Sequence, residues 1–223
     1  MRAPVDDPKR DVTWRQGMLL ILAVLLLGGV VGTRVWQAAR DDGVELRDHH
    51  LLKKIGGQSV GRDLDFSSVD VPLERLRGDG EIEKRPVLRQ LLVDHEVVLL
   101  NFWASWCPPC LDELGSLYAL AKALPQRRLR VVAVSYDDDW SAQERVWKEL
   151  LGSATPGRVL WLRDPQGQEG PRNKMMRSHF GTDKLPETYV LVGGAIVARF
   201  VGPQDWNRPA MRRYLDSVGG ARR

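Results

Sequence analysis

The clearest pattern in the chain is a series of continuous apolar runs that alternate with segments of helical spacing. Residues 97–104 (VVLLNFWA) form the first run, and its β-branched and aromatic residues are typical of a strand buried on both faces. Residues 108–124 have apolar positions three and four apart, which predicts an amphipathic helix. The same order then repeats, predicting a strand over 130–137, a helix over 141–152 and a strand over 158–164.

The last part of the chain predicts a hairpin between two helices. We expect a short helix over 171–181, a hairpin over 187–202 that turns at Gly193-Gly194, and a closing helix over 204–220. Strands that alternate with helices and then end in a hairpin predict an α/β sandwich with a mixed sheet.

Shorter signals suggest where some of these elements begin. Ser141 followed by Glu144 resembles a capping box, so Ser141 is the predicted cap of its helix. A helix over 86–92 would have proline in its first turn. The rest of 61–92 is interrupted by proline and glycine, and we expect loops with a short strand or helix there.

An uncharged apolar run lies near the amino terminus, over residues 17–32. Extended to Trp36 it reaches the roughly 20 residues that a membrane-spanning helix needs, and Arg34 can extend its charge to the lipid headgroups. The basic flanks favour a cytoplasmic amino terminus. A cleaved signal peptide is the alternative, and both interpretations send the rest of the chain out of the cytoplasm.

The chain therefore divides into four predicted segments. These are a cytoplasmic tail (1–16), a transmembrane anchor (17–36), a polar linker (37–60) and a folded domain (61–223). The formal net charge is only +4, and no long basic run is interleaved with aromatic residues, so we expect no nucleic-acid partner.

Both cysteines of the chain lie three positions apart, where the first strand gives way to its helix. The partial positive charge of a helix N-terminus lowers the pKa of a thiol at Cys107, whereas Pro108 and Pro109 remove N–H donors and temper that effect. A purely structural Cys107–Cys110 disulfide would close a very short loop and gain little chain entropy. A zinc site lacks further ligands at suitable spacing. The pair is therefore predicted to be redox-active.

The stretch NFWASWCPPCLDEL (101–114) resembles the active site of the thioredoxin superfamily. It is especially similar to the membrane-anchored TlpA/ResA/CcmG-like thiol-disulfide oxidoreductases of bacteria. A second stretch, LPETYVLV (185–192), resembles the cis-proline segment of that family. The resemblance covers about residues 95–217 and implies a thioredoxin-like three-layer sandwich, preceded in this chain by one transmembrane helix.

The resemblance also implies roles for individual residues. Cys107 would be the exposed nucleophile that attacks a substrate disulfide, and Cys110 the thiol that resolves the mixed disulfide. Pro186 would be the cis-proline, which exposes the backbone of Leu185 for pairing with an extended substrate. The expected substrate-binding residues are Trp106, Pro108, Pro109, Leu185 and Pro186.

A third catalytic group is expected on the helix after the cysteines. Asn101 stands where thioredoxins have a buried aspartate, so that proton acceptor is absent. The resemblance implies that Glu113, three residues after Cys110, accepts the proton of Cys110 during resolution. The alternative is that Glu113 is a helix-surface charge, as Asp112 is expected to be.

These features predict a reductant of protein disulfides, held in the bacterial inner membrane by a single span with its catalytic domain in the periplasm. Pro108 and Pro109 supply no cationic histidine to hold a strongly acidic thiolate, which favours a reductant over an oxidant. Expected partners are protein thiols and disulfides, such as those of apocytochrome c or a copper-site assembly factor, and a membrane thiol electron donor.

No cofactor or metal is expected beyond the redox-active Cys107–Cys110 disulfide, because the chain has no nicotinamide or flavin fingerprint. Two alternative functions use the same thiols. One is a thiol peroxidase on the same fold, and the other is a metal chaperone or docking module without catalysis.

Overall fold

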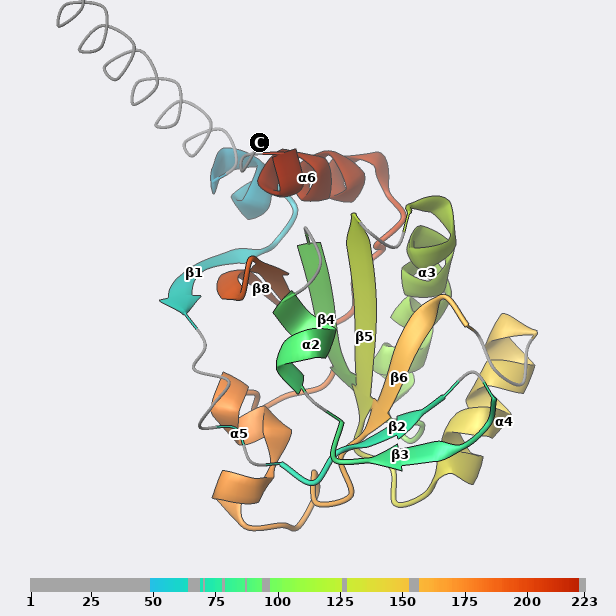
Figure 1. Cartoon of the computed structure of the whole chain (residues 1–223). Coiled ribbons are helices and arrows are strands. Elements are labelled where there is room, and N and C mark those ends of the chain that lie inside the picture. Colours follow the sequence, from blue (N-terminus) through green and yellow to red (C-terminus); the bar gives the residue numbers. More distant parts are fainter. Residues whose placement is uncertain are drawn as a thin grey trace, which may run out of the picture. The chain divides into compact units, whose positions relative to one another are not determined.

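The buried run that begins at Val97 is the central strand β4 (Val97–Trp103) of an eight-stranded sheet in the computed structural model of the chain (Figure 1). All of its residues are buried, as the continuous apolar pattern predicts. The structure describes residues 49–63, 69, 71–77, 79–86, 88–93, 97–125, 128–152 and 157–220.

The sheet is mixed, with the order β1-β8-β7-β4-β5-β6-β2-β3. Strands β4, β5 and β6 are parallel, and every other neighbouring pair is antiparallel. Besides β4, the strands are β1 (Gln58–Asp63), β2 (Glu74–Leu76), β3 (Ile82–Lys84), β5 (Leu129–Ser135), β6 (Val159–Arg163), β7 (Glu187–Val192) and β8 (Ala195–Val201).

Helices cover both faces of this sheet and make the fold three-layered (Figure 1). The helices are α2 (Leu88–Val93), α3 (Pro108–Ala123), α4 (Trp140–Leu151), the 3-10 helix η1 (Arg172–Lys174), α5 (Met176–Phe180) and α6 (Pro209–Gly220). On one face, the ring of Trp161 in β6 packs on Trp147 of α4. On the other face, the ring of Phe102 in β4 packs on Phe180 of α5. Because side chains of a strand alternate between faces, these contacts place α4 and α5 on opposite faces of the sheet.

The alternating strands and helices from β4 to β6 are confirmed, with ends that differ from the expected ones by one or two residues. The terminal hairpin is also confirmed, with β7 and β8 joined at Gly193 and Gly194. Both glycines have positive φ, which side chains disfavour and a tight hairpin turn requires. The closing helix begins at Pro209, where its missing N–H costs no hydrogen bond.

The predicted linker over 37–60 is wrong for the part that the structure describes. Residues 49–54 are helical, and Leu52 and Ile55 are buried in the core. The following strand β1 pairs antiparallel with β8 and forms one edge of the sheet. The compact unit accordingly begins at Arg47 rather than at residue 61. The polar residues of this segment face solvent, which gave it the composition of a linker.

The predicted cap of α4 is also wrong. The helix begins one residue earlier than expected, and its cap is Asp139, whose carboxylate accepts a hydrogen bond from the N–H of Ala142. The hydroxyl of Ser141 donates to the same carboxylate. Ser141 therefore supports the cap from within the first turn, and an aspartate competes well for this position.

Three shorter segments differ from their predictions in extent. The helix expected over 171–181 is divided into η1 and α5, and it ends at Gly181, which has the left-handed conformation. The helix expected from Pro86 begins at Leu88. Strands β2 and β3 form an antiparallel hairpin that the interrupted sequence did not predict, and β2 joins this hairpin to β6.

The apolar run over 17–36 lies outside the described residues, so its prediction stays open. Among the residues that the structure does describe, no helix combines the length and apolarity needed to cross a membrane.

Candidate active site

The two cysteines lie at a β-turn that connects β4 to α3. The N–H of Cys107 donates to the carbonyl of Ala104 at 3.2 Å, which closes the turn around Ser105 and Trp106. Cys107 is the N-cap residue of α3, with extended backbone, and its carbonyl accepts the N–H of Cys110 at 2.9 Å. The predicted position at the mouth of the helix is therefore observed.

Cys107 and Cys110 form a disulfide, with their Cα atoms 5.3 Å apart. Cys107 is 6% exposed and Cys110 is 1% exposed. The prediction that the nucleophile is openly exposed is therefore wrong for this oxidised state, because the turn and its neighbours cover most of the residue. Cys107 is still the more accessible of the two, which agrees with the order of attack that the resemblance implies.

Glu113 is buried on α3, not a surface charge. Its Oε1 accepts a hydrogen bond from Nδ2 of Asn101 at 2.7 Å. Its Oε2 accepts from the backbone N–H of Gln204 at 3.0 Å and from the indole N–H of Trp206 at 3.1 Å. The amide of Asn101 is oriented in turn by Thr188 of β7, at 2.9 Å. Four separate parts of the chain thus fix one carboxylate in the core.

Burial raises the pKa of Glu113 from 4.5 to about 7, because desolvation disfavours the charged form. The hydrogen bonds from Gln204, Trp206 and Asn101 act in the opposite direction and limit the rise. A carboxyl group with such a pKa exchanges its proton near neutral pH, where a general base is most effective. Glu113 and Cys110 are both buried and three residues apart on α3, so they lie on the same side of the helix.

The Leu185-Pro186 peptide bond is cis, as the resemblance implies. The pairing of β7 with β4 places Glu187 opposite Phe102, and continuing this register brings Pro186 to the end of β4 where the cysteine turn begins. The carbonyl of Pro186 accepts the N–H of Gly202 at 2.9 Å. The backbone of Leu185 forms no hydrogen bond with any residue that the structure describes.

The sequence that forms this site matches a known protein family. A model of the AhpC/TSA family matches residues 76–191, more than half of the 223 residues. The chain belongs to this family.

Its similar relatives are named thiol:disulfide interchange proteins. DsbE of Yersinia pestis is 33% identical over 153 residues, which cover 67% of this chain and 71% of that protein. DsbE of Haemophilus influenzae is 33% identical over 153 residues, covering 68% and 76%. DsbE of Escherichia coli is 26% identical over 208 residues, covering 88% and 95%. The present AhpC/TSA family member is accordingly a thiol-disulfide oxidoreductase.

The fold agrees with this assignment. A crystal structure described as a thiol:disulfide interchange protein DsbE from Chlorobium tepidum superposes with a TM-score of 0.52 at 20% identity. The superposition covers 73% of this chain and 100% of the other. The oxidoreductase therefore has a thioredoxin-like fold with a mixed sheet.

Two tryptophans near the cysteines differ in their exposure to solvent. Trp106 is 56% exposed at the tip of the cysteine turn, and Pro108 and Pro109 are exposed beside it. Trp103 is fully buried and packs edge-on against Trp161. The exposed apolar surface beside Cys107 therefore comes from the turn and from the first two residues of α3.

Sequence reasoning missed Gln204 and Trp206 as partners of Glu113. Both lie about ninety residues after it, in the segment between β8 and α6. No spacing rule links them to the cysteine motif. The one available signal was the position of Trp206 soon after the predicted hairpin. A tryptophan that is buried there needs an acceptor for its indole N–H.

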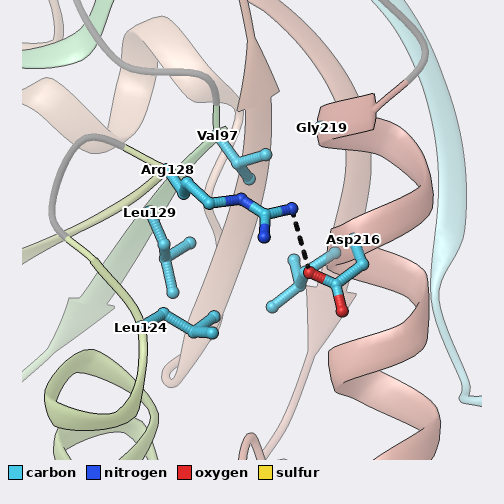
Figure 2. Close-up of a pocket in the computed structure, with 7 residues that line it drawn as sticks. Val97, Leu124, Arg128, Leu129, Asp216 and Gly219 are labelled. Atoms are coloured by element: carbon cyan, nitrogen blue, oxygen red, sulfur yellow. Dashed lines mark hydrogen bonds and ion pairs between the residues drawn. The ribbon is translucent and has the colours of Figure 1, made fainter.

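A small surface pocket lies at the opposite end of β4 from the cysteines. It is bordered by the first residues of β4 and β5 and by Asp216 of α6, whose carboxylate is 3.3 Å from Nη2 of Arg128 (Figure 2). Because this pocket is at the other end of the strands, it is not part of the redox site. Within the described residues, no group of three or more His, Cys, Asp or Glu side chains is placed to hold a metal ion.

Proposed function

We propose that this oxidoreductase reduces disulfides of partner proteins outside the cytoplasm, while anchored in the bacterial inner membrane by residues 17–36. The observation that carries the proposal is the pairing of a Cys107–Cys110 disulfide with a buried Glu113 whose pKa is about 7. In its reduced form, this site provides a dithiol together with a buried carboxylate that can accept the proton of the Cys110 thiol near neutral pH.

In the proposed reaction, the reduced enzyme starts the exchange. The Cys107 thiolate attacks one sulfur of the substrate disulfide, forming a mixed disulfide and releasing the other substrate sulfur as a thiolate, which takes up a proton. The sulfur of Cys110 then attacks Cys107, which frees the second substrate thiol. Two electrons pass from the enzyme to the substrate, and the enzyme is left with the Cys107–Cys110 disulfide.

Glu113 provides the proton acceptor for the second step. Cys110 is buried, and its thiol must lose a proton before its sulfur can attack. An ionised Glu113 on the same side of α3 accepts that proton, directly or through one water molecule. The hydrogen bonds from Asn101, Gln204 and Trp206 hold the carboxylate in place.

The substrate-binding surface combines backbone and apolar contacts. The backbone groups of Leu185, which bond to none of the described residues, can pair with an extended segment of a partner protein in the manner of an added strand. Trp106 together with Pro108 and Pro109 presents exposed apolar surface beside Cys107. Substrates that offer a flexible, extended cysteine-containing segment fit this surface, and apocytochrome c or a copper-site assembly factor are proposed examples.

Trapping identifies the substrate. In the Cys110→Ser variant, the mixed disulfide on Cys107 cannot be resolved, so the physiological partner stays attached and mass spectrometry identifies it. A Cys107→Ser/Cys110→Ser double variant is the matched control and retains no partner. We expect trapped partners with paired cysteines in extracytoplasmic proteins and in a membrane thiol carrier.

Two outcomes would contradict the proposal. One is the absence of a reversible dithiol–disulfide couple in a glutathione titration of the wild-type protein. The other is recovery of the full-length chain in the soluble cytoplasmic fraction. Rapid peroxide consumption by the reduced enzyme would favour a peroxidase, and stoichiometric copper binding without dithiol turnover would favour a metal chaperone.

A further inference from the structure

A buried carboxylate outside the Glu113 network holds the cysteine turn. Asp137 follows β5 and is only 2% exposed. Its Oδ1 accepts hydrogen bonds from the backbone N–H of Ser105 at 3.0 Å and from the Ser105 hydroxyl at 2.7 Å. Ser105 is the second residue of the turn that leads to Cys107. Asp137 therefore binds both polar donors of a residue that sets the path of the turn.

Two serines fix the orientation of the Asp137 carboxylate. The hydroxyl of Ser135 donates to Oδ2 of Asp137 at 2.6 Å and accepts the Asp137 N–H at 2.9 Å. Ser105 and Ser135 together thus hold both oxygens of the carboxylate.

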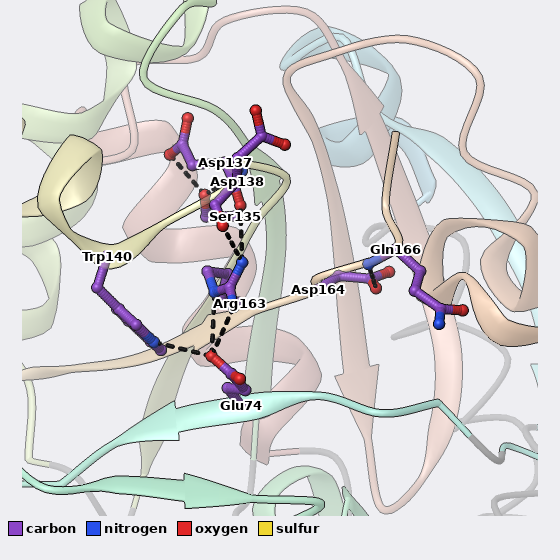
Figure 3. A network of polar contacts seen from close by, with 8 residues as sticks. All are labelled: Glu74, Ser135, Asp137, Asp138, Trp140, Arg163, Asp164 and Gln166. Carbon is purple, nitrogen blue, oxygen red and sulfur yellow. Dashed lines mark hydrogen bonds and ion pairs between the residues drawn. The ribbon is translucent and has the colours of Figure 1, made fainter. Parts of the chain in front are cut away.

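An arginine of β6 also holds the backbone of Asp137 (Figure 3). Arg163 of β6 donates from Nη1 to the carbonyls of Asp137 and Asp138. Its Nη2 lies 2.8 Å from Oε2 of Glu74 in β2, and both side chains are largely buried. Trp140 donates to the same oxygen at 3.0 Å. Arg163 is matched by Glu74, so the charge of Asp137 has no cationic side chain of its own within this network.

We propose that Asp137 is a positioning residue of the redox site, with two effects on thiol–disulfide exchange. Through Ser105 it holds the turn that presents Trp106 and Cys107 to a partner protein. Through its charge it disfavours a thiolate at Cys107, because a buried like charge that contacts the cysteine turn raises the free energy of an anion there. The second effect favours the disulfide form and makes the enzyme a stronger reductant.

The inference rests on the exchange chemistry of Cys107 and Cys110 and explains the reducing direction proposed above. It also supplies an electrostatic effect on the Cys107 thiol that Pro108 and Pro109 cannot provide. They remove two N–H donors from the first turn of α3, but they add no charge. Asp137 supplies a charge close to the turn, from a strand end that is distant in sequence.

The test measures the equilibrium of the enzyme with reduced and oxidised glutathione, together with the rate of exchange with a protein disulfide. Asp137→Asn and Asp137→Ser both remove the charge but differ in size and hydrogen bonding. We expect each to shift the equilibrium constant at least tenfold toward the dithiol, about 30 mV for a two-electron couple. Asp138→Asn, on the exposed neighbouring residue, is the matched control and should shift it less than threefold.

Ser105→Ala tests the positioning effect separately, because it leaves the charge in place. We expect an equilibrium constant within threefold of wild type, but exchange with a protein disulfide slowed at least threefold, and unchanged exchange with a small aromatic disulfide. Wild-type rates in Ser105→Ala overturn the positioning effect even if the Asp137 variants do not fold.

Equal shifts in the Asp137 and Asp138 variants overturn the charge effect. Equal destabilisation of the oxidised and reduced forms without a shift in equilibrium would likewise show that Asp137 is merely structural. A wild-type protein without any reversible couple would instead overturn the proposed function, so the two failures are distinguishable.

Discussion

At the scale of single residues, the site depends on one carboxylate whose chemistry is set by its surroundings. Glu113 and Asp112 are adjacent acidic residues of α3, yet Glu113 is buried and Asp112 is exposed. The sequence left both a catalytic and a surface role open for Glu113. Its burial and its hydrogen bonds with Asn101, Gln204 and Trp206 exclude the surface role.

Replacing Glu113 with Gln should slow resolution of the mixed disulfide about 100-fold at pH 7, because the variant lacks a general base beside Cys110. In the wild type, the rate of resolution should rise with pH through about 7, as Glu113 ionises. Stopped-flow measurement of substrate thiol release checks both effects. Asp112→Asn is the matched control, and a similar loss in that variant would contradict the assignment.

The same carboxyl group should make the stability of the oxidised protein depend on pH. Its pKa is raised in the folded state, so between about pH 4.5 and 7 the folded state binds more protons than the unfolded state. The contribution of Glu113 to the free energy of unfolding therefore falls as pH rises through this window, by about 3 kcal/mol at most, and is constant above it.

Urea unfolding of the oxidised wild type and Glu113→Gln at pH 5 and pH 8 checks this dependence. The difference between the two proteins isolates the contribution of Glu113 from that of other titrating groups. A wild type that gained stability over the variant as pH rose would contradict the expected direction of the change.

At the scale of elements, strand ends and helix starts position the chemistry. Strand β4 ends in a turn, and α3 begins directly after Cys107, so the sulfur lies at the positive end of the helix dipole. The next strand–helix connection, from β5 to α4, carries both Asp137 and the cap residue Asp139. These two consecutive connections, at the carboxyl ends of the parallel strands β4 and β5, therefore meet at the redox site.

The cap of α4 gives a prediction at this scale. Asp139→Ala should lower the urea midpoint of unfolding more than Ser141→Ala does, because the N–H of Ala142 loses its acceptor only in the first variant. Equilibrium unfolding of both variants at pH 7 makes the comparison. A larger loss in Ser141→Ala would restore the capping box that the sequence pattern favoured.

At the scale of the whole molecule, the sheet extends at both edges beyond the predicted core. Strand β1 is added beside β8 at one edge, and the β2–β3 hairpin is added beside β6 at the other. Gly57 lies so close to Leu52 and Phe200 that a Cβ atom there would overlap both side chains. The segment before β1 is therefore packed into the domain and cannot act as a free linker.

Leu52→Ala tests this boundary directly. A buried leucine truncated to alanine costs about 2–5 kcal/mol, whereas a change in a solvated linker costs less than about 0.5 kcal/mol. Urea unfolding should show the larger loss for Leu52→Ala and little change for Lys53→Ala, since Lys53 is exposed. Equal and small losses of stability in both variants would instead show that this segment is a solvated linker.

Much of the central fold was predictable because its strands are buried on both faces and its helices have a regular apolar spacing. The edges were not, because β1 is mostly exposed and β2 and β3 are three residues each. Such segments carry little hydrophobic signal, and their pairing depends on neighbours distant in sequence. The cysteines could be identified as a redox pair from their local spacing. The roles of Trp206 and Asp137 could not, because their partners are distant in sequence.

The sequence by itself determined where the sulfur pair lies, since a buried strand, a turn and a helix are local consequences of apolar pattern and proline. It also determined the order of the central elements. Only the tertiary structure decided which charges surround that pair. Burial and hydrogen bonding act through space, so the raised pKa of Glu113 and the anchoring of Asp137 against Ser105 arise from contacts between segments that no local pattern connects.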